Sequence, residues 1–413
     1  DTHVQHADVQ LVLDNTTLLV GHNIKFDLVW LWESGFTYDG DVYDTMIAEY
    51  LLLRCQNWGV SLADSCIRRK VAQKKGDLIE DYIKSGIGFD KMPMDTVEEY
   101  GIADIVSTRE LHFAQQELYS ADRNAPLKKH LKLMNKFLPV LATLEQNGIK
   151  IDFKELHKVR SDYQIEKADL QIKLEDVCHE VMGDRLINFA SPAQLSELIY
   201  SRRITDKKKW AEAFNIGLDE KGKPLHRPHM GVTKFADTIR QLTTRVHKTR
   251  AEQCTYCKGR GEYYKRKVDG NLWKKPTKCK VCAGDGFMQI PLPKIGGLTM
   301  NPQGVMDVSA SGFSTDKLTL LRLYKAATNK GNANAEKFLK SSVRLNAVDV
   351  YLSSFIGGIA RNVKPNGILH PKFNQCITRT TRLSSSDPNF QNQPRGNTFP
   401  VRRVVISRFD NGS

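Results

Sequence analysis

The sequence predicts an α/β domain at its N-terminal end, a mainly α-helical region after it, and short β segments at its C-terminal end. Three observations lead to this prediction. Short apolar runs alternate with helix-like runs over residues 16–120, and helical periodicity dominates residues 125–200. A compact segment with four cysteines, residues 254–287, then interrupts the helical region.

The charge of the chain is unevenly distributed. The 413 residues carry a net charge of +14, yet residues 1–124 hold 11 Lys and Arg against 21 Asp and Glu. The basic excess of the rest indicates a polyanionic partner, and nucleic acid is the first hypothesis. A merely soluble basic domain is the alternative.

The composition indicates the cellular compartment of the protein and whether a membrane contact is expected. No apolar run approaches the roughly 18 residues that a membrane span needs, so no membrane partner is expected. Eight cysteines, four of them in two CxxC pairs, favour a reducing compartment and metal binding over disulfides. We therefore expect a cytoplasmic protein.

The first strand–helix unit begins with a buried strand over residues 16–21 and continues into a helix that we expect to turn Phe26, Val29 and Trp32 inward. Asp27 falls in the first turn of that helix, close to the end of the strand.

A second strand–helix unit places Asp44 at the end of a strand through Val42 and Tyr43. Farther along, Tyr100 and Asp104 stand four residues apart on a predicted helix and so share one face. Carboxylates grouped in this way suit Mg²⁺, which prefers oxygen ligands. Each acid taken alone is better explained as a helix cap or a solvated side chain.

Two of these segments resemble the 3′–5′ exonuclease domain of family A DNA polymerases. "GHNIKFD" is similar to the second exonuclease motif of that family and "YGIAD" to the third. The resemblance implies an RNase H-like fold, Asp27 and Asp104 as Mg²⁺ ligands, and Tyr100 as the residue that orients the attacking water; Asp44 matches a structural position. The first motif of the family, Asp-x-Glu, has no match, so the domain is expected to be incomplete.

The helical region resembles the thumb of the same polymerases. "PVLATLEQNGIKID" and "NFASPAQLSELIY" are similar to its beginning, and "KSSVRLNAVDVYL" to its continuation. We therefore expect an exonuclease-like domain at 1–124, a thumb at 125–362 with an insertion at about 204–329, and the beginning of a palm at 363–413. Podovirus-like members of this family carry a thumb insertion that helps to hold the template, so the resemblance implies this role for the insertion here. A processivity factor is a candidate partner there.

The four-cysteine segment predicts a structural metal site. Cys254, Cys257, Cys279 and Cys282 form two CxxC pairs, each followed by glycines that permit tight turns. Four thiolates complete the tetrahedral shell of Zn²⁺ and leave no open position for catalysis. The pattern resembles the cysteine-rich repeats of DnaJ-type chaperones; free thiols or a redox pair are the alternatives.

Basic and aromatic residues lie between the two pairs. Nine Lys and Arg, among them Lys265, Arg266 and Lys267, face only two acids over residues 258–280. Such a segment suits contact with phosphates, and its rings can stack on bases. A solvated, partner-binding or purely stabilising knuckle remains the alternative.

The C-terminal stretch "FNQCITRTTRLSSSDPNFQNQPRG" closely resembles the segment that leads into the palm of family A polymerases. The resemblance implies that Arg382 reaches the minor groove at the primer terminus and that Asn389 and Gln391 contact the template–primer. Thr381 replaces a usual Gly, and Gln393 a usual Ile.

Taken together, these resemblances imply a fragment of a family A, DNA-directed DNA polymerase of viral type. Its parent would act on primed DNA and dNTPs in viral DNA replication, with proofreading and two-metal Mg²⁺ sites. The chain ends before the expected palm carboxylates, so we expect the fragment itself to be inactive. A non-catalytic DNA-binding subunit of a split polymerase is the alternative, and a free-standing exonuclease with a DNA-binding tail is a third.

Overall fold

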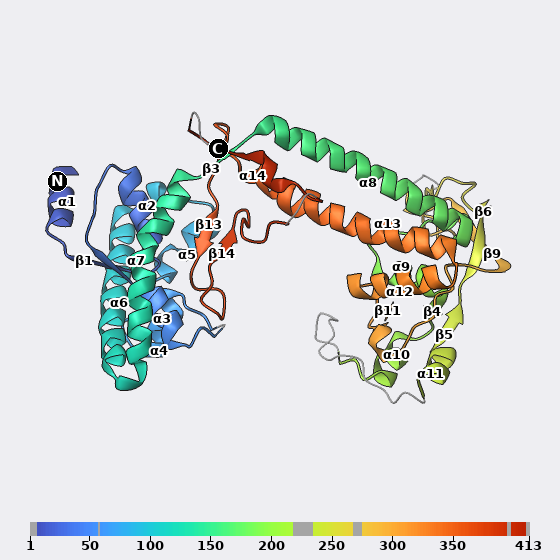
Figure 1. Cartoon of the computed structure of the whole chain (residues 1–413), viewed down its shortest axis with the longest axis horizontal. Coiled ribbons are helices and arrows are strands. Elements are labelled where there is room, and N and C mark those ends of the chain that lie inside the picture. Colours follow the sequence, from blue (N-terminus) through green and yellow to red (C-terminus); the bar gives the residue numbers. More distant parts are fainter. Residues whose placement is uncertain (1–5, 57, 218–233, 267–274, 395–397, 410–413) are drawn as a thin grey trace. The chain divides into compact units, whose positions relative to one another are not determined.

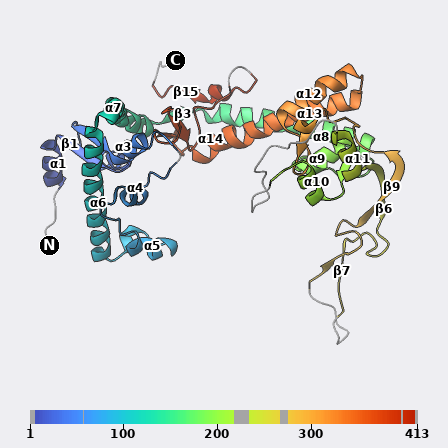
Figure 2. The same cartoon turned by 90° about the horizontal axis from the view of Figure 1, so that it is seen from below.

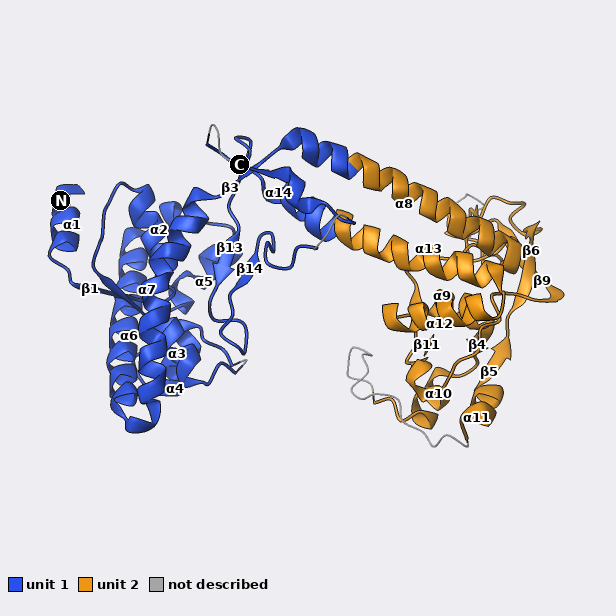
Figure 3. Ribbon diagram, viewed as in Figure 1, with its two compact units in different colours: residues 1–160, 353–413 blue, residues 161–352 orange. Residues whose placement is uncertain are grey.

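A computed structural model describes residues 6–56, 58–217, 234–266, 275–394 and 398–409. The chain forms two compact units, residues 1–160 with 353–413 and residues 161–352 (Figures 1 and 3). These units cut across the domain boundaries drawn from the sequence, which stay a prediction. In the described part of the chain, no helix combines the length and apolarity needed to cross a membrane.

The first unit begins with a two-stranded parallel sheet whose strands alternate with helices. β1 and β2 pair from Leu18 with Asp41 to Gly21 with Asp44, which places the C-terminal ends of both strands at one edge. The elements are α1 (His6–Asp14), β1 (Leu18–Gly21), α2 (Lys25–Glu33), β2 (Asp41–Asp44), α3 (Thr45–Leu52), α4 (Leu62–Arg69) and α5 (Asp77–Lys84).

Two long helices, α6 (Met94–Ser120) and α7 (Ala125–Asn147), complete the helical packing around this sheet (Figure 1). The expected helix around Tyr100 and Asp104 is thus confirmed as part of α6. α7 ends at Asn147, and the next residue, Gly148, has a φ of +65°, which glycine adopts without the steric cost of a side chain.

The core of this unit corrects one expectation about α2. Ile24 and Leu28 are buried against β2, α3 and α7, whereas Phe26 is 61% exposed. The inward position predicted for Phe26 was therefore wrong, whereas Trp32 packs against this core as predicted and Val29 is half-buried. The cause is composition: α2 is apolar around most of its circumference, so its sequence carries no single stripe that marks the buried face.

C-terminal segments join the first unit as short antiparallel strands. β3 (Ile149–Ile151) lies between β12 (Ile368–Leu369) and β15 (Val405–Ile406), and β13 (Lys372–Asn374) pairs with β14 (Ser384–Ser386). A short helix, α14 (Gly357–Asn362), leads into them. The expected β segments at the C-terminal end are confirmed.

Long helices dominate the second unit. Within it, α8 (Phe153–Met182) and α13 (Ala333–Val350) are tied by a bidentate ion pair between Arg344 and Glu166, at 2.6 and 2.9 Å. α12 (Lys317–Asn329) packs along α13. The remaining elements are α9 (Pro192–Tyr200), β4 (Arg202–Ile204), α10 (Lys207–Ala213), α11 (Phe235–Leu242), β5 (Thr243–Arg245), β10 (Val308–Ser309) and β11 (Gly312–Phe313).

A long antiparallel ribbon carries the four-cysteine segment. β6 (His247–Gln253) pairs with β9 (Phe287–Ile295), and between them lie the short strands β7 (Glu262–Tyr263) and β8 (Thr277–Lys278). Figure 2 shows β7 beyond the end of the ribbon, away from the helices of this unit.

Candidate active site and metal centre

Asp27 and Asp104, predicted as a pair from separate segments, line one cleft of about 680 Å³ in the first unit. Asp27 comes from the first turn of α2 and Asp104 from α6, while Val20 and Gly21 contribute the end of β1. The structure therefore brings the two carboxylates to a common cavity across 77 residues of sequence.

The turn that leads from β1 into α2 is held by a buried carboxylate. Asp44 caps α3 by accepting from the backbone N–H groups of Met46 and Ile47, and it also accepts from those of Asn23 at 3.0 Å and Ile24 at 3.1 Å. Burial raises the pKa of Asp44 to about 6, while these four donors act in the opposite direction. Asp44 thus fixes the start of α2 and is committed to a structural role.

Tyr100 is connected to Asp104 through a lysine. The Nζ atom of Lys74 donates to the Tyr100 hydroxyl at 2.7 Å and to Asp104 Oδ2 at 3.4 Å, and it lies 4.9 Å from the centre of the Tyr100 ring. Burial lowers the pKa of Lys74, but the hydrogen bond to Tyr100 and the charge of Asp104 outweigh it and raise the pKa overall. A cation is therefore already in place between the two predicted residues.

The other oxygen of Asp104 has no partner. Asp104 Oδ1 is buried and accepts no hydrogen bond from any described residue. A buried carboxylate oxygen without a donor is costly unless something satisfies it. Burial also raises the pKa of Asp27. Both observations fit a site that takes up a cation, because a divalent ion would satisfy the free oxygen and favour the charged carboxylates.

A histidine presents a lone pair to the same cleft. The Thr45 hydroxyl donates its single hydrogen to Gly21 O at 3.0 Å. The hydroxyl also lies 2.9 Å from His22 Nδ1, and in this second contact it acts as the acceptor. The ring proton of His22 is therefore on Nδ1. His22 Nε2 is then a bare acceptor, buried and without a partner. Burial lowers the pKa of His22 to about 4, so the ring is neutral at physiological pH. His112, also in the cleft, likewise has its pKa lowered by burial.

Only one group of three or more metal-binding side chains is closely clustered in the described ranges. The Sγ atoms of Cys254, Cys257, Cys279 and Cys282 all lie within 4.8 Å of one another, and all four residues are buried. Asp27 and Asp104 belong to no such cluster. Of the ligands that a two-metal site needs, the cleft therefore contains the two predicted carboxylates, those of Asp27 and Asp104.

The geometry of the sulfurs fits a tetrahedral ion. Cys254 Sγ lies 3.8 Å from Cys279 Sγ, and Cys257 Sγ lies 3.6 Å from Cys282 Sγ. A tetrahedron with metal–sulfur bonds of about 2.3 Å has edges of about 3.8 Å. None of the four forms a disulfide. The segment is therefore arranged as a closed four-thiol site that could hold a metal ion.

Backbone N–H groups support the thiols. Gly261 N donates to Cys257 Sγ at 3.3 Å, and Gly286 N donates to Cys282 Sγ at 3.2 Å. Burial raises the pKa of the Cys282 thiol, but N–H donors from Gly284 and Gly286 outweigh it and lower the pKa to about 7. The two CxxC segments, here called knuckles, therefore share one geometry. In each of them a backbone N–H donor stabilises the thiolate form that a metal requires.

The segment between the two CxxC pairs, residues 258–280, is called the finger below, and the structure describes only some of its basic residues. Lys265 and Arg266 are exposed, and Lys267 lies outside the described residues. Tyr264 is 49% exposed nearby. Exposed charge next to an exposed ring is compatible with nucleic-acid contact, and the roles of these residues stay a prediction.

The predicted DNA-contacting residues of the C-terminal segment lie before and after β14 of the first unit. Arg382 and Gln391 are exposed. Asn389 instead uses its Oδ1 atom within the loop, where it accepts from the N–H groups of Gln391 and Asn392 at 3.0 and 3.1 Å. Thr381, at the position of a usual Gly, has a φ of +55°.

Sequence patterns missed three side chains of the cleft. His22 stands inside "GHNIKFD", but its role depends on a contact with Thr45, which is far along the chain. Lys74 and His112 belong to no motif, and only the folded structure brings them to the carboxylates. No signal in the sequence singles out Lys74, and an acceptor role for His22 is visible only from its hydrogen bond.

Comparisons with known proteins relate this chain to DNA polymerases. Residues 2–117 match the model of the 3′-5′ exonuclease family of DNA polymerase A. DNA polymerase I of Synechocystis sp. is 29% identical over 192 residues, which are 45% of this chain and 18% of that protein. The DNA polymerase of Bacillus phage SP01 is 22% identical over 412 residues, covering 95% of this chain and 37% of that one.

A solved structure shares the fold. The polymerase domain of Pol1 from M. smegmatis, solved in complex with DNA primer-template and dNTP, is 18% identical with a TM-score of 0.54. The alignment covers 98% of this chain and 47% of that chain. The chain therefore spans less than half the length of the curated relatives described above. The predicted fold class, an RNase H-like exonuclease domain with a helical polymerase region, is confirmed.

Proposed function

We infer that this chain, a homologue of family A DNA polymerases whose residues 2–117 match their 3′-5′ exonuclease domain, serves proofreading DNA synthesis. The parent activity is DNA-directed DNA polymerisation on primed templates with dNTPs. The observation that supports the exonuclease part most directly is the cleft that joins Asp27 and Asp104. The match to a phage polymerase supports a viral setting, with the host cytoplasm as the location.

In this proposal the cleft residues hold and orient the reactants. Asp27 and Asp104 bind divalent metal, with the unpartnered Oδ1 of Asp104 as the available oxygen. Mg²⁺ supplies a Lewis acid and lowers the pKa of bound water. Tyr100 accepts the Lys74 hydrogen bond and is left to orient a water molecule. His22 Nε2 accepts a hydrogen bond from the substrate or from a water.

Metal binding and 3′-end degradation test this assignment. Asp27→Asn and Asp104→Asn should each weaken Mn²⁺ binding to the chain by at least about tenfold, because each removes one anionic ligand from a two-carboxylate site. Asp39→Asn, an exposed acid outside the cleft, is the control and should leave Mn²⁺ binding unchanged.

In a full-length homologous polymerase that carries residues 1–413, Asp104→Asn should abolish degradation of single-stranded 3′ ends and leave primer extension intact. Equal loss of extension and degradation would overturn the role given to Asp104, and unchanged metal binding in both cleft variants would overturn the site.

The four-cysteine segment is proposed to bind one structural Zn²⁺ per chain and to present a basic finger to DNA. The sulfur–sulfur distances support the metal, and the exposed Lys265 and Arg266 support the contact. Arg382, with Asn389 and Gln391, is proposed to contact the template–primer. A processivity factor bound at residues 204–329 stays a prediction.

Zinc content and DNA affinity test the finger together. Lys265→Gln with Arg266→Gln should weaken binding to primed duplex and make its salt dependence shallower by about 2 in the log–log slope, since each lysine or arginine contact with B-DNA contributes about 0.9. Zinc should stay bound in that variant. Unchanged affinity and slope would make the finger a stabilising element only.

A further inference from the structure

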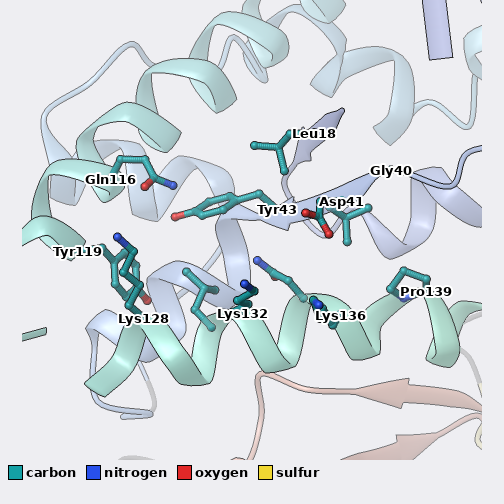
Figure 4. Close-up of a pocket in the computed structure, with 13 residues that line it drawn as sticks. Leu18, Gly40, Asp41, Tyr43, Gln116, Tyr119, Lys128, Lys132, Lys136 and Pro139 are labelled. Carbon is teal, nitrogen blue, oxygen red and sulfur yellow. The ribbon is translucent and has the colours of Figure 1, made fainter. Parts of the chain in front are cut away.

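A second cavity in the first unit contains a row of lysines that the exonuclease assignment does not use. Its volume is about 370 Å³, at the lower end of the roughly 300–1,000 Å³ typical of ligand sites. The N-terminal parts of β1 and β2, the C-terminal end of α6 and one face of α7 line it (Figure 4). It shares no lining residue with the cleft of Asp27 and Asp104.

The lysines are Lys128, Lys132 and Lys136 of α7. Their spacing of four residues puts them on one face of the helix, and Figure 4 shows them on the side of α7 that faces Tyr43. Successive lysines are about 6 Å apart along the helix axis, so the row is about 12 Å long. On one strand of a duplex, where nucleotides follow each other at about 3.4 Å of axial rise, this length spans about three to four nucleotide steps.

No described carboxylate pairs with these three ammonium groups. Other lysines of the same unit do find partners, such as Lys75 with Glu99 at 2.6 Å and Lys84 with Glu80 at 2.7 Å. The only acid that lines the cavity is Asp41, which makes no ion pair with them. The cavity wall therefore carries an excess of two positive charges.

The floor of the cavity offers little for a base to stack on. Tyr43 and Tyr119 are 6% and 3% exposed, and their hydroxyls donate to Gln115 Oε1 and Ala48 O. Tyr43 also packs edge to face on His112 at 4.4 Å, and this contact separates the cavity from the cleft. A lysine ammonium group binds a phosphate as a point charge and imposes no fixed geometry on it. The chemistry therefore favours a backbone contact that is independent of base sequence.

We propose that Lys128, Lys132 and Lys136 bind phosphates of a single DNA strand, over about three to four nucleotides, at a site separate from the exonuclease cleft. The proposal rests on the proposed function in that DNA is the polyanion, but it assigns a surface that the catalytic residues do not reach. An acidic peptide is the competing occupant, and Asp41 on the opposite wall disfavours it no more than it disfavours DNA. The regular spacing of the row favours the strand.

The test compares two triple variants of the whole chain. Lys128→Gln, Lys132→Gln and Lys136→Gln remove the row. Lys91→Gln, Arg123→Gln and Lys129→Gln remove the same charge from exposed positions outside the cavity. Binding of a labelled dT₁₂ strand is followed by fluorescence anisotropy as salt rises from 50 to 200 mM, and thermal melts check that both variants fold.

The row variant should lose about 2 in the slope of log K against log salt, because each contact with a single strand contributes about 0.7. The control should keep the parent slope. Hydrogen exchange should show dT₁₂ protecting peptides that cover residues 39–44 and 128–139 in the parent and control, but not in the row variant.

Equal slopes for the two variants would overturn the inference, as would protection of these peptides by oligoglutamate and not by dT₁₂. Failure of the parent itself to bind primed DNA or dT₁₂ would instead overturn the proposed function.

Discussion

The close backbone packing of the four-cysteine segment can be tested at two of its glycines. These two glycines have nearly the same backbone φ but different neighbouring atoms. Gly286 has a φ of +80° and Gly259 a φ of +79°. A methyl group on Gly286 would lie 2.4 Å from the backbone oxygen of Gly259. A methyl group on Gly259 would meet the side chain of Gln253, with its amide nitrogen at 2.7 Å. We therefore compare Gly286→Ala with Gly259→Ala.

The left-handed conformation costs both variants the same, about 1–2 kcal/mol, so this cost cancels. The Gln253 side chain can rotate away from the new methyl of Gly259→Ala. In Gly286→Ala, two backbone segments must separate by about 1 Å to reach an ordinary contact of about 3.5 Å. That shift removes the bond from Cys254 N to Gly286 O, at 2.8 Å, and the bond from Gly286 N to Cys282 Sγ, at 3.2 Å.

Each lost hydrogen bond is worth about 1 kcal/mol, so Gly286→Ala should be worse by about 2 kcal/mol. Folding and metal binding are coupled in small thiolate sites, so this difference appears in the zinc affinity. We expect zinc to bind Gly286→Ala about 30-fold more weakly than Gly259→Ala. The measurement is competition for zinc with a chromophoric chelator at fixed pH. Equal affinities in the two variants would refute the packing argument, and so would a larger loss in Gly259→Ala.

Three further predictions concern other parts of the chain. Thr381→Gly should stabilise the first unit by about 0.5–1 kcal/mol in urea unfolding, because a β-branched residue at φ +55° costs more than the added flexibility of glycine; destabilisation would contradict this. Burial raises the pKa of Glu197, but Arg203 and Arg185 outweigh it and lower the pKa, so its stabilising effect is present above pH 4.5 and is lost as the pH falls through the folded-state pKa. Glu197→Gln should accordingly cost about 1 kcal/mol near neutral pH and less with acidification, after allowance for the exposed Arg203; a cost independent of pH would contradict the ion-pair argument. Lys74→Met should tighten Mn²⁺ binding at the cleft by about fivefold, since it removes a positive charge beside Asp104; weaker Mn²⁺ binding would show that Lys74 organises the site instead.

Local patterns predicted the secondary structure around the cleft well, because each depends on neighbours in sequence. Asp44 caps α3 through bonds to the next few residues, and Tyr100 and Asp104 share a face by helical spacing alone. The knuckles were predictable for the same reason, since each CxxC pair and its glycines lie within eight residues. The metal-ready arrangement of the four sulfurs followed from two such local units.

Packing against distant segments was not predictable in the same way. The buried face of α2 was only partly predicted, because its sequence is apolar on most sides. Trp32 packs against the core as expected but Phe26 does not. The choice of Ile24 and Leu28 is made by α3 and α7. The two compact units also escaped prediction. Residues 125–160 pack with the N-terminal region, and β3 pairs with strands more than 200 residues later. Such pairings leave no periodic signal in either segment.

The electrostatic character of the cleft joins both levels. Local sequence supplies the carboxylates of Asp27 and Asp104, but tertiary packing decides which side chains face them. Lys74 lies within hydrogen-bond distance of Asp104. His22 carries its ring proton on Nδ1, where it contacts Thr45. With Asp104 Oδ1 unpartnered beside them, the cleft holds one cation of its own and retains an oxygen for another. We therefore expect metal affinity at this site to depend on Lys74 as well as on the carboxylates that a motif can identify, because the charge of Lys74 acts on any ion that approaches Asp104.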